Sequence, residues 1–367
     1  MSEGLSPSTG ASTGLHRPSA EPSDGVEATR PHWQRVSLAV VSRTVFWVAL
    51  VEVALVIVFG FLSTDHVFWT LGSFQDIALD AAEVVPLAAA LALLLGAGEL
   101  DISVGANIIL SSVLGGKVMI ALSTPTAAQL ANGVFPNLGE SITLGLLTCL
   151  AVGVGIGLVN GLVVTRLKVN SFITTLAMLG IATGIAEIVA NDVDLANIPT
   201  PLQLQFGVAT LGGILPYPAL LGLVVVIVLW LVLTFTRFGL HTVALGSSRE
   251  AARRAGLHVD REVVALFMIV GAVAGLAAFI DLSRFATTNI TGHQTDALAA
   301  IAAAIIGGTK LFGGSVSIVG AMIGALLAVI LQDGLVLIGL QNFYQLIAIG
   351  CVLIAAVYID QKRRRLA

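Results

Sequence analysis

Charged residues are scarce in this sequence. Asp, Glu, Lys and Arg make up only 11% of its 367 residues, whereas 56% are hydrophobic. A typical soluble domain is roughly 25% charged and 45–50% apolar. A water-soluble globule cannot bury so much apolar surface, so the composition excludes one and predicts an integral membrane protein. The formal net charge of -4 is small and does not indicate nucleic acid as a partner.

Residues that carry metal or covalent chemistry are also few. Cys149 and Cys351 lie in apolar runs with no second Cys or His at ligand spacing, so we expect small buried side chains rather than a disulfide or metal site. The six histidines are scattered over the tail and loops, and no nucleophile-base-acid set is visible in the sequence. Lys310 follows two glycines, but the sequence contains no Walker string. We therefore predict that the chain is not an enzyme and has no metal, cofactor or nucleotide site.

The amino-terminal stretch lacks apolar runs and is rich in Ser, Pro, Gly and Thr. Without an apolar h-region it is not a cleavable signal peptide. Its composition cannot bury enough surface to offset the entropy of ordering. We predict a disordered cytoplasmic tail of unknown role over residues 1–37, followed by a transmembrane domain over residues 38–367.

Long apolar runs, in contrast, are abundant. A helix needs roughly 17–25 mostly apolar residues to cross a hydrocarbon core of about 30 Å. Ten segments qualify as candidates: 44–62, 78–97, 102–122, 142–164, 172–190, 217–235, 263–282, 297–308, 317–338 and 343–360. The second, third and eighth are short or are interrupted by glycine and charged residues.

The placement of Lys and Arg sets the orientation of these spans. Basic residues concentrate in short cytoplasmic segments. Ten spans with the amino terminus inside place all but two of the 18 Lys and Arg residues in the cytoplasm. The two exceptions are Arg284, which falls outside, and Lys117, which falls within a span. The prediction is an all-α, polytopic membrane protein with both termini cytoplasmic.

Some polar positions within or next to the spans are functional candidates. Glu52 lies in the middle of the first span, where a carboxyl group is costly; alternatively, it faces a neighbouring helix and stays protonated or hydrogen-bonded. Asp101 or Ser103 would cap the helix that follows them. The pairs Gly307-Gly308 and Gly313-Gly314 favour a tight turn or a broken helix over a continuous one.

The longest polar connection covers residues 237–262, which this topology places in the cytoplasm. Within it, residues 248–256 begin with a serine, continue with helix-forming residues and stop at a glycine, a pattern that predicts a short amphipathic helix. The segment is either a solvated basic loop that only satisfies orientation or a docking helix for a soluble partner.

Four stretches, in order, resemble the ribose-type sugar permeases of bacterial ATP-binding-cassette (ABC) importers, in the branched-chain amino acid/ribose permease superfamily. Residues 99–105 (ELDISVG) are similar to the family's GIDLSVG motif, and residues 157–176 (GLVNGLVVTRLKVNSFITTL) to its NG-to-FI-TL stretch. Residues 237–257 (RFGLHTVALGSSREAARRAGL) are similar to its FGR-to-AA-SGI loop, and residues 296–314 (DALAAIAAAIIGGTKLFGG) to its LDAIAA-GGTSL-GG segment. The resemblance covers about residue 38 to the end. The positions that depart from the pattern are Ala106, Asn170, Ser171, Leu240, Ser247 and Ala255.

The resemblance implies a type II importer-like permease in the bacterial cytoplasmic (inner) membrane, surrounded by lipid. It would pair with a second permease copy, identical or related, and receive its solute from an extracytoplasmic solute-binding protein. A cytoplasmic ABC ATPase, often a tandem one in this family, would bind the ATP. The solute would be a monosaccharide, either a pentose or a hexose, or another small polar molecule such as a nucleoside, a polyol or a sugar-like signal.

The resemblance also implies roles for individual residues. The helix that couples to the ATPase would comprise Ser248, Arg249, Glu250, Ala251, Ala252, Arg253, Arg254 and Gly256. The residues near the translocation path or gate would be Asp101, Ser103, Gly105, Asn107, Asn160, Phe172, Thr174, Thr175, Asp296, Gly307, Gly308 and Thr309.

Two other function classes compete with this interpretation. An ion-coupled secondary transporter would show paired carboxylates or broken helices at matched depth in two halves, and only Glu52 stands out as mid-span. A membrane enzyme would need acids or histidines clustered at one membrane face, and the sequence shows no such cluster. The pattern of residues disfavours both classes.

Overall fold

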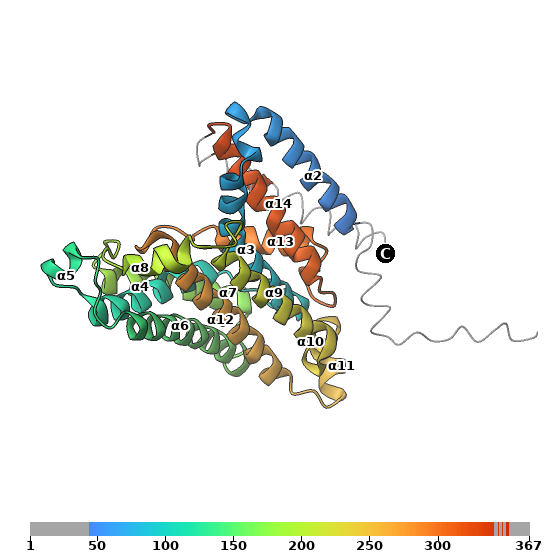
Figure 1. The fold of residues 1–367 in the computed structure, drawn as a ribbon. Helices are drawn as coiled ribbons and strands as arrows, with labels where there is room; N and C mark the ends of the chain where they lie inside the picture. The colour runs from blue at the N-terminus through green and yellow to red at the C-terminus, as the bar shows by residue number, and fades with distance from the viewer. Residues whose placement is uncertain (1–43, 341–343, 345–346, 348–349, 352–367) are drawn as a thin grey trace, which may run out of the picture.

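The computed structural model describes residues 44–340 together with residues 344, 347, 350 and 351 (Figure 1). The predicted tail over residues 1–37 lies outside the described residues, as does nearly all of the predicted last span, 343–360. Within the described part the chain is almost entirely helical.

Eight of the described helices are long and apolar enough to cross a membrane. They are α2 (Thr44–Leu62), α3 (Leu71–Gly96), α4 (Val104–Ser123), α6 (Leu138–Arg166), α7 (Ser171–Ala190), α9 (Tyr217–Phe235), α12 (Val259–Phe285) and α14 (Ile318–Leu337). Each corresponds to a predicted span: α2 and α9 have the predicted ends, and the ends of the others differ by at most seven residues. These helices confirm the prediction of an all-α polytopic membrane protein.

The eighth predicted span, 297–308, is a shorter helix in the structure than the prediction required. Its helix, α13 (Asp296–Ile306), has 11 residues and is therefore only about 16 Å long at 1.5 Å per residue, roughly half of a hydrocarbon core. The chain leaves the helical conformation at the first glycine pair and resumes it at α14. The total of ten spans therefore stays a prediction.

The remaining elements are short and lie between the long helices. They are the 3₁₀ helix η1 (Thr64–Trp69), α5 (Ala127–Ala131), α8 (Thr200–Leu202), the π-helical turn η2 (Gln203–Gly207), the paired two-residue strands β1 (Thr210–Leu211) and β2 (Leu215–Pro216), α10 (Arg237–Ser247) and α11 (Arg249–Arg254). Figure 1 shows α5 and α8 at one end of the bundle and α10 and α11 at the opposite end.

Glycines bring α6 and α12 into close contact. A Cβ atom added at Gly153 would lie 2.2 Å from the carbonyl oxygen of Gly271, and one added at Gly157 would lie 2.2 Å from that of Phe267. Side chains at these glycines would force the helices apart, because membrane helices that pack this closely need small residues at the interface. The pair α6 and α12 therefore forms a tightly packed centre that supports the sites described below.

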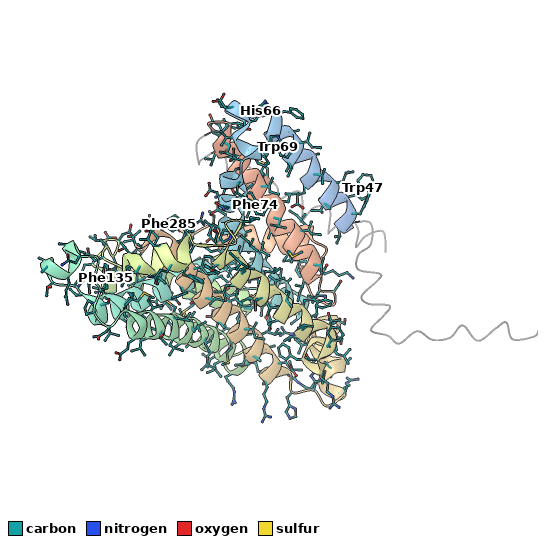
Figure 2. All side chains as sticks on the ribbon, in the orientation of Figure 1. Trp47, His66, Trp69, Phe74, Phe135 and Phe285 are labelled. Atoms are coloured by element: carbon teal, nitrogen blue, oxygen red, sulfur yellow. The ribbon has the colours of Figure 1, made fainter. Side chains whose placement is uncertain are left out.

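The outer surface of the bundle is apolar. Trp47 and Phe61 of α2 are 60% and 72% exposed, and Ile188 of α7 is 77% exposed. Figure 2 shows Trp47 on the outward side of α2. An apolar surface of this kind is unfavourable in water and suits contact with lipid.

Candidate functional site

The connection over residues 237–262 folds into two helices, α10 and α11. The Thr236 hydroxyl accepts the Gly239 N–H at 3.4 Å at the start of α10, and the Ser248 hydroxyl accepts the Ala251 N–H at 3.2 Å at the start of α11. Gly256, just beyond α11, has a φ of +86°, a value that favours glycine. The predicted short helix is thus confirmed, with its serine cap and its glycine stop.

The sequence interpretation missed α10 and treated its residues as loop. The helix buries Gly239, Thr242 and Leu245, which lie three residues apart and so share one face. Its two glycines and the flanking charges disguised this pattern. Most of α11 is exposed, with Ala252 as its buried residue, and the side chains of Arg253 and Arg254 are 64% and 80% exposed. α11 therefore presents a charged surface at its end of the bundle.

Three segments that are distant in sequence meet beside α11. The Arg249 guanidinium pairs with the Glu99 carboxylate, which is only 4% exposed and follows α3. The Gly314 N–H donates to the Gly96 carbonyl at 2.9 Å. A Cβ atom at Gly246 would lie 1.9 Å from the same carbonyl oxygen. We call these five residues the junction, because they connect α10 and α11 to the end of α3 and to the break between α13 and α14.

The break contains the two predicted glycine pairs. Gly308, Gly313 and Gly314 have φ values between +87° and +98°, in the left-handed region where side chains are strained. The Thr309 hydroxyl accepts the Ser317 N–H at 3.1 Å, and Gly307 packs against the Gly320 backbone. This geometry confirms the prediction of a turn rather than a continuous helix.

A polar network lies next to the junction. The Asp101 carboxylate accepts the Ser103 N–H at 2.8 Å and its hydroxyl at 2.6 Å. The Asn160 amide of α6 donates to the Ser103 hydroxyl at 3.0 Å, and the Thr175 hydroxyl of α7 accepts the Ile102 N–H at 3.3 Å. All four polar side chains are at most 3% exposed. Burial raises the pKa of Asp101, while its hydrogen bonds with Ser103 lower it in part.

This network corrects the capping prediction. Ser103 occupies the N-cap position of α4, but its side chain makes no cap hydrogen bond. Its hydroxyl donates to Asp101 instead, and the Asp101 carboxylate bonds Ser103 rather than the first turn of the helix. Both side chains thus tie the segment between α3 and α4 to itself and to α6.

The other predicted path residues lie outside the polar network. Asn107 donates to the Gly153 carbonyl at 3.2 Å, and Gly105 packs against the His293 carbonyl. Phe172 is 49% exposed at the start of α7. Thr174 is buried, and its hydroxyl has no hydrogen-bond partner in the described part of the chain. The structure therefore brings Asp101, Ser103, Asn160 and Thr175 together, whereas Asp296 lies in a separate group.

That separate group is a set of ionisable residues from four helices and the loop before α13, which we call the acidic cluster. Its members are Asp80 and Glu83 of α3, Asp281 and Arg284 of α12, His293, Asp296 of α13, and Asp333 of α14. The cluster is far from α11. An α-helix rises about 1.5 Å per residue, so Asp281 lies about 33 Å along α12 from Val259, the first residue of α12 after α11.

Charged contacts join the members of the acidic cluster. Arg284 Nη1 lies 2.5 Å from Asp80 Oδ1 and 3.8 Å from Glu83 Oε1. His293 Nδ1 lies 2.7 Å from Asp296 Oδ2, and its Nε2 lies 3.5 Å from Asp281 Oδ1. Burial by itself lowers the pKa of His293, but the two carboxylates outweigh it and hold the pKa well above its ordinary value. The two carboxylates therefore favour the charged form of the imidazole.

Sequence reasoning missed this cluster and singled out Glu52 alone. The sequence showed no cluster of acids, and the structure corrects this interpretation. The clustered acids come from helices between α3 and α14, which lie up to about 250 residues apart in the sequence. One signal was present: Arg284 is the basic residue that the predicted topology leaves outside. Cys149 is buried as expected, but Cys351 is exposed. No three His, Cys, Asp or Glu side chains of the described residues are placed to hold a metal ion.

Comparison with known proteins gives consistent relatives. A family model described as "Branched-chain amino acid transport system / permease component" matches residues 73–357. The ribose import permease protein RbsC of Bacillus subtilis is 34% identical over 267 residues, covering 72% of this chain and 77% of that protein. RbsC of Escherichia coli K12 is 30% identical over 318 residues, covering 85% and 93%. The D-allose permease AlsC of E. coli is 30% identical over 315 residues, covering 84% and 88%. No solved structure matches this chain.

Proposed function

The chain belongs to the branched-chain amino acid transport system permease family, among the sugar permeases of ABC importers, and we propose that it forms the pathway through which a monosaccharide enters the cell. The solute would be a pentose or a hexose delivered by an extracytoplasmic binding protein. The names of its relatives support this class: they include permeases for ribose, for D-allose and for L-arabinose.

The observation that best supports this function is the junction. Arg249 is the first residue of α11, and its partner Glu99 precedes the polar network by two residues. A buried carboxylate needs a compensating charge, so Glu99 holds the segment before α4 to α11. A force applied to α11 would reach the end of α3 and the start of α4 through this ion pair.

We infer that the partner applying this force is a cytoplasmic ABC ATPase. Import needs two membrane states whose balance is shifted by a ligand that binds them unequally. ATP binding to a separate subunit provides that difference, and rigid shifts of docked helices transmit it. In this proposal α11 is the coupling helix, both termini lie in the cytoplasm, a second permease copy completes the pathway, and the chain itself binds no cofactor.

Co-purification tests the assignment of α11. The importer is expressed with its ATPase, and a tag on the permease recovers the complex from membranes. We expect the double change Arg253→Glu with Arg254→Glu to abolish recovery of the ATPase, because it reverses the exposed charge of α11. Arg166→Glu is the control, since Arg166 is an exposed basic residue at the end of α6. Full recovery and full transport in the double variant would contradict the role of α11.

A further inference from the structure

The acidic cluster contains more hydrogen-bond acceptors than donors. Five carboxylates, those of Asp80, Glu83, Asp281, Asp296 and Asp333, surround one guanidinium and one imidazole. Each carboxyl group offers two acceptor oxygens and at most one donor, whereas the guanidinium only donates hydrogen bonds. The cluster therefore has spare acceptors that a donor-rich molecule would satisfy.

Several of these polar atoms are buried and make no hydrogen bond among the described residues. Asp281 is 2% exposed, and its Oδ2 has no hydrogen-bond partner among the residues that the structure describes. His293 Nε2 and Glu83 Oε1 also make no hydrogen bond among the described residues, and their ion pairs with Asp281 and Arg284 are long, at 3.5 and 3.8 Å. Buried polar groups are nearly always paired, so each exception calls for an explanation. The second oxygen of Asp281 is therefore free to accept a hydrogen bond from a ligand.

The cluster has an accessible rim and a buried floor. The side chains of Asp80 and Asp296 are 29% and 28% exposed, whereas those of Asp281 and His293 are 3% and 9% exposed. A charged side chain that faced hydrocarbon would be costly, and ionisable residues in membrane helices usually face a bundle interior or a water-filled path. The rim therefore does not face hydrocarbon, and a solute that reached it would meet the buried acceptors behind it.

We propose that the acidic cluster is a binding site for a polyhydroxyl solute, located about 30 Å from the coupling helix along α12. Hydroxyl groups donate to the spare oxygens of Asp281, Glu83 and Asp333 and accept from Arg284 and His293. A metal ion is disfavoured, because no three ligand side chains among the described residues are placed to hold one. The assignment rests on the proposed function and adds the residues that contact the solute.

Uptake by the whole importer tests the site. Cells that carry the permease with its binding protein and ATPase are given radiolabelled D-ribose, D-allose, L-arabinose or D-galactose at saturating concentration. Asp281→Asn keeps the size of the side chain but replaces one acceptor with a donor. Asp333→Asn changes a partly exposed member and covers the case in which Asp281→Asn fails to fold. Glu187→Gln is the matched control, since Glu187 is an exposed acid on α7 outside the cluster.

We expect both cluster variants to reach the membrane and bind the ATPase normally. Their saturating uptake should fall roughly tenfold, the loss expected from one hydrogen bond to a charged group. The ratio of rates between two sugars should change as well, because hydroxyls at different carbons contact different acceptors. A purely structural role would lower the rates of all sugars in proportion.

Three results would overturn the assignment. The first is uptake and sugar preference equal to those of Glu187→Gln. The second is a proportional loss for every sugar. The third is sodium-dependent uptake that loses its sodium dependence in the variants, which would make the cluster a cation site. The first two leave the proposed function standing, whereas sodium-driven uptake, or a wild-type importer that takes up no sugar, refutes the proposed function and the site with it.

Discussion

The ion pair between Arg249 and Glu99 should transmit force from the ATPase, and breaking it should uncouple ATP hydrolysis from import. Glu99 is 4% exposed, and the Arg249 side chain is 49% exposed. Exposed pairs contribute about 0–1 kcal/mol, whereas removing one partner of a fully buried pair costs about 3–5 kcal/mol. For this half-exposed pair we expect about 1–3 kcal/mol, which corresponds to a roughly 5- to 150-fold change in the balance of two states.

The measurement is the number of ATP molecules hydrolysed for each sugar imported by the complex in proteoliposomes. Arg249→Gln should raise this number severalfold while the ATPase stays bound, because Arg253 and Arg254 remain to dock it. Glu99→Gln should do the same. The double variant should be no worse than either single one, since the pair acts as a unit.

A matched control uses another ion pair at the same end of the molecule. Lys168 Nζ lies 3.4 Å from Asp260 Oδ1, with side chains 64% and 48% exposed, so Lys168→Gln should leave the ratio unchanged. If Arg249→Gln matches this control, or if the two single effects simply add in the double variant, the reasoning about force transmission is refuted.

Three further outcomes follow from the packing and from the charges. Gly271→Ala should destabilise the protein by about 1–3 kcal/mol and so lower its melting temperature in detergent, because the added Cβ would lie 2.2 Å from the Gly153 carbonyl oxygen. Gly180→Ala should leave the melting temperature unchanged, because a Cβ at Gly180 would have no atom within 4 Å. Gly246→Ala should reduce coupled transport at least about tenfold, because its Cβ would meet the Gly96 carbonyl at 1.9 Å; normal transport would contradict the geometry of the junction. The pKa of His293 is raised above its ordinary 6.5, so its contribution to stability is complete below pH 6.5 and is lost as the pH rises through the raised value. The melting temperature of wild type should therefore exceed that of His293→Gln by more at pH 6 than at pH 10.

Much of this fold could be predicted because the relevant signals are local. Apolar runs of sufficient length located the eight long helices, and the serine and glycine at the two ends of α11 located that helix. The errors arose where the local pattern was ambiguous. α13 reads as a span because its alanines are apolar, but the glycine pair that follows ends the helix after about three turns. α10 reads as loop because glycines interrupt the face on which Leu245 is buried.

The sites were harder to predict than the helices because they depend on contacts between distant segments. The polar network was anticipated in part, since Asp101, Ser103, Asn160 and Thr175 all stand in stretches that resemble the family. The ion pair between Glu99 and Arg249 joins residues 150 positions apart, and the sequence around either residue does not identify the other as its partner. The acidic cluster was missed for the same reason, although Arg284 was a usable clue, because it is a basic residue that the predicted topology leaves outside.

The two sites are physically connected at the start of α4. The Gly105 Cα faces the His293 carbonyl so closely that a Cβ there would lie 1.9 Å from it, and His293 is a member of the acidic cluster. On the other side, Gly105 is two residues from Ser103 of the polar network, which follows Glu99 and the junction. Tightly packed segments shift between discrete arrangements rather than deforming gradually. A displacement of α11 that moves the segment before α4 therefore also moves the floor of the acidic cluster, so ATP binding at one end would change the fit for a solute at the other.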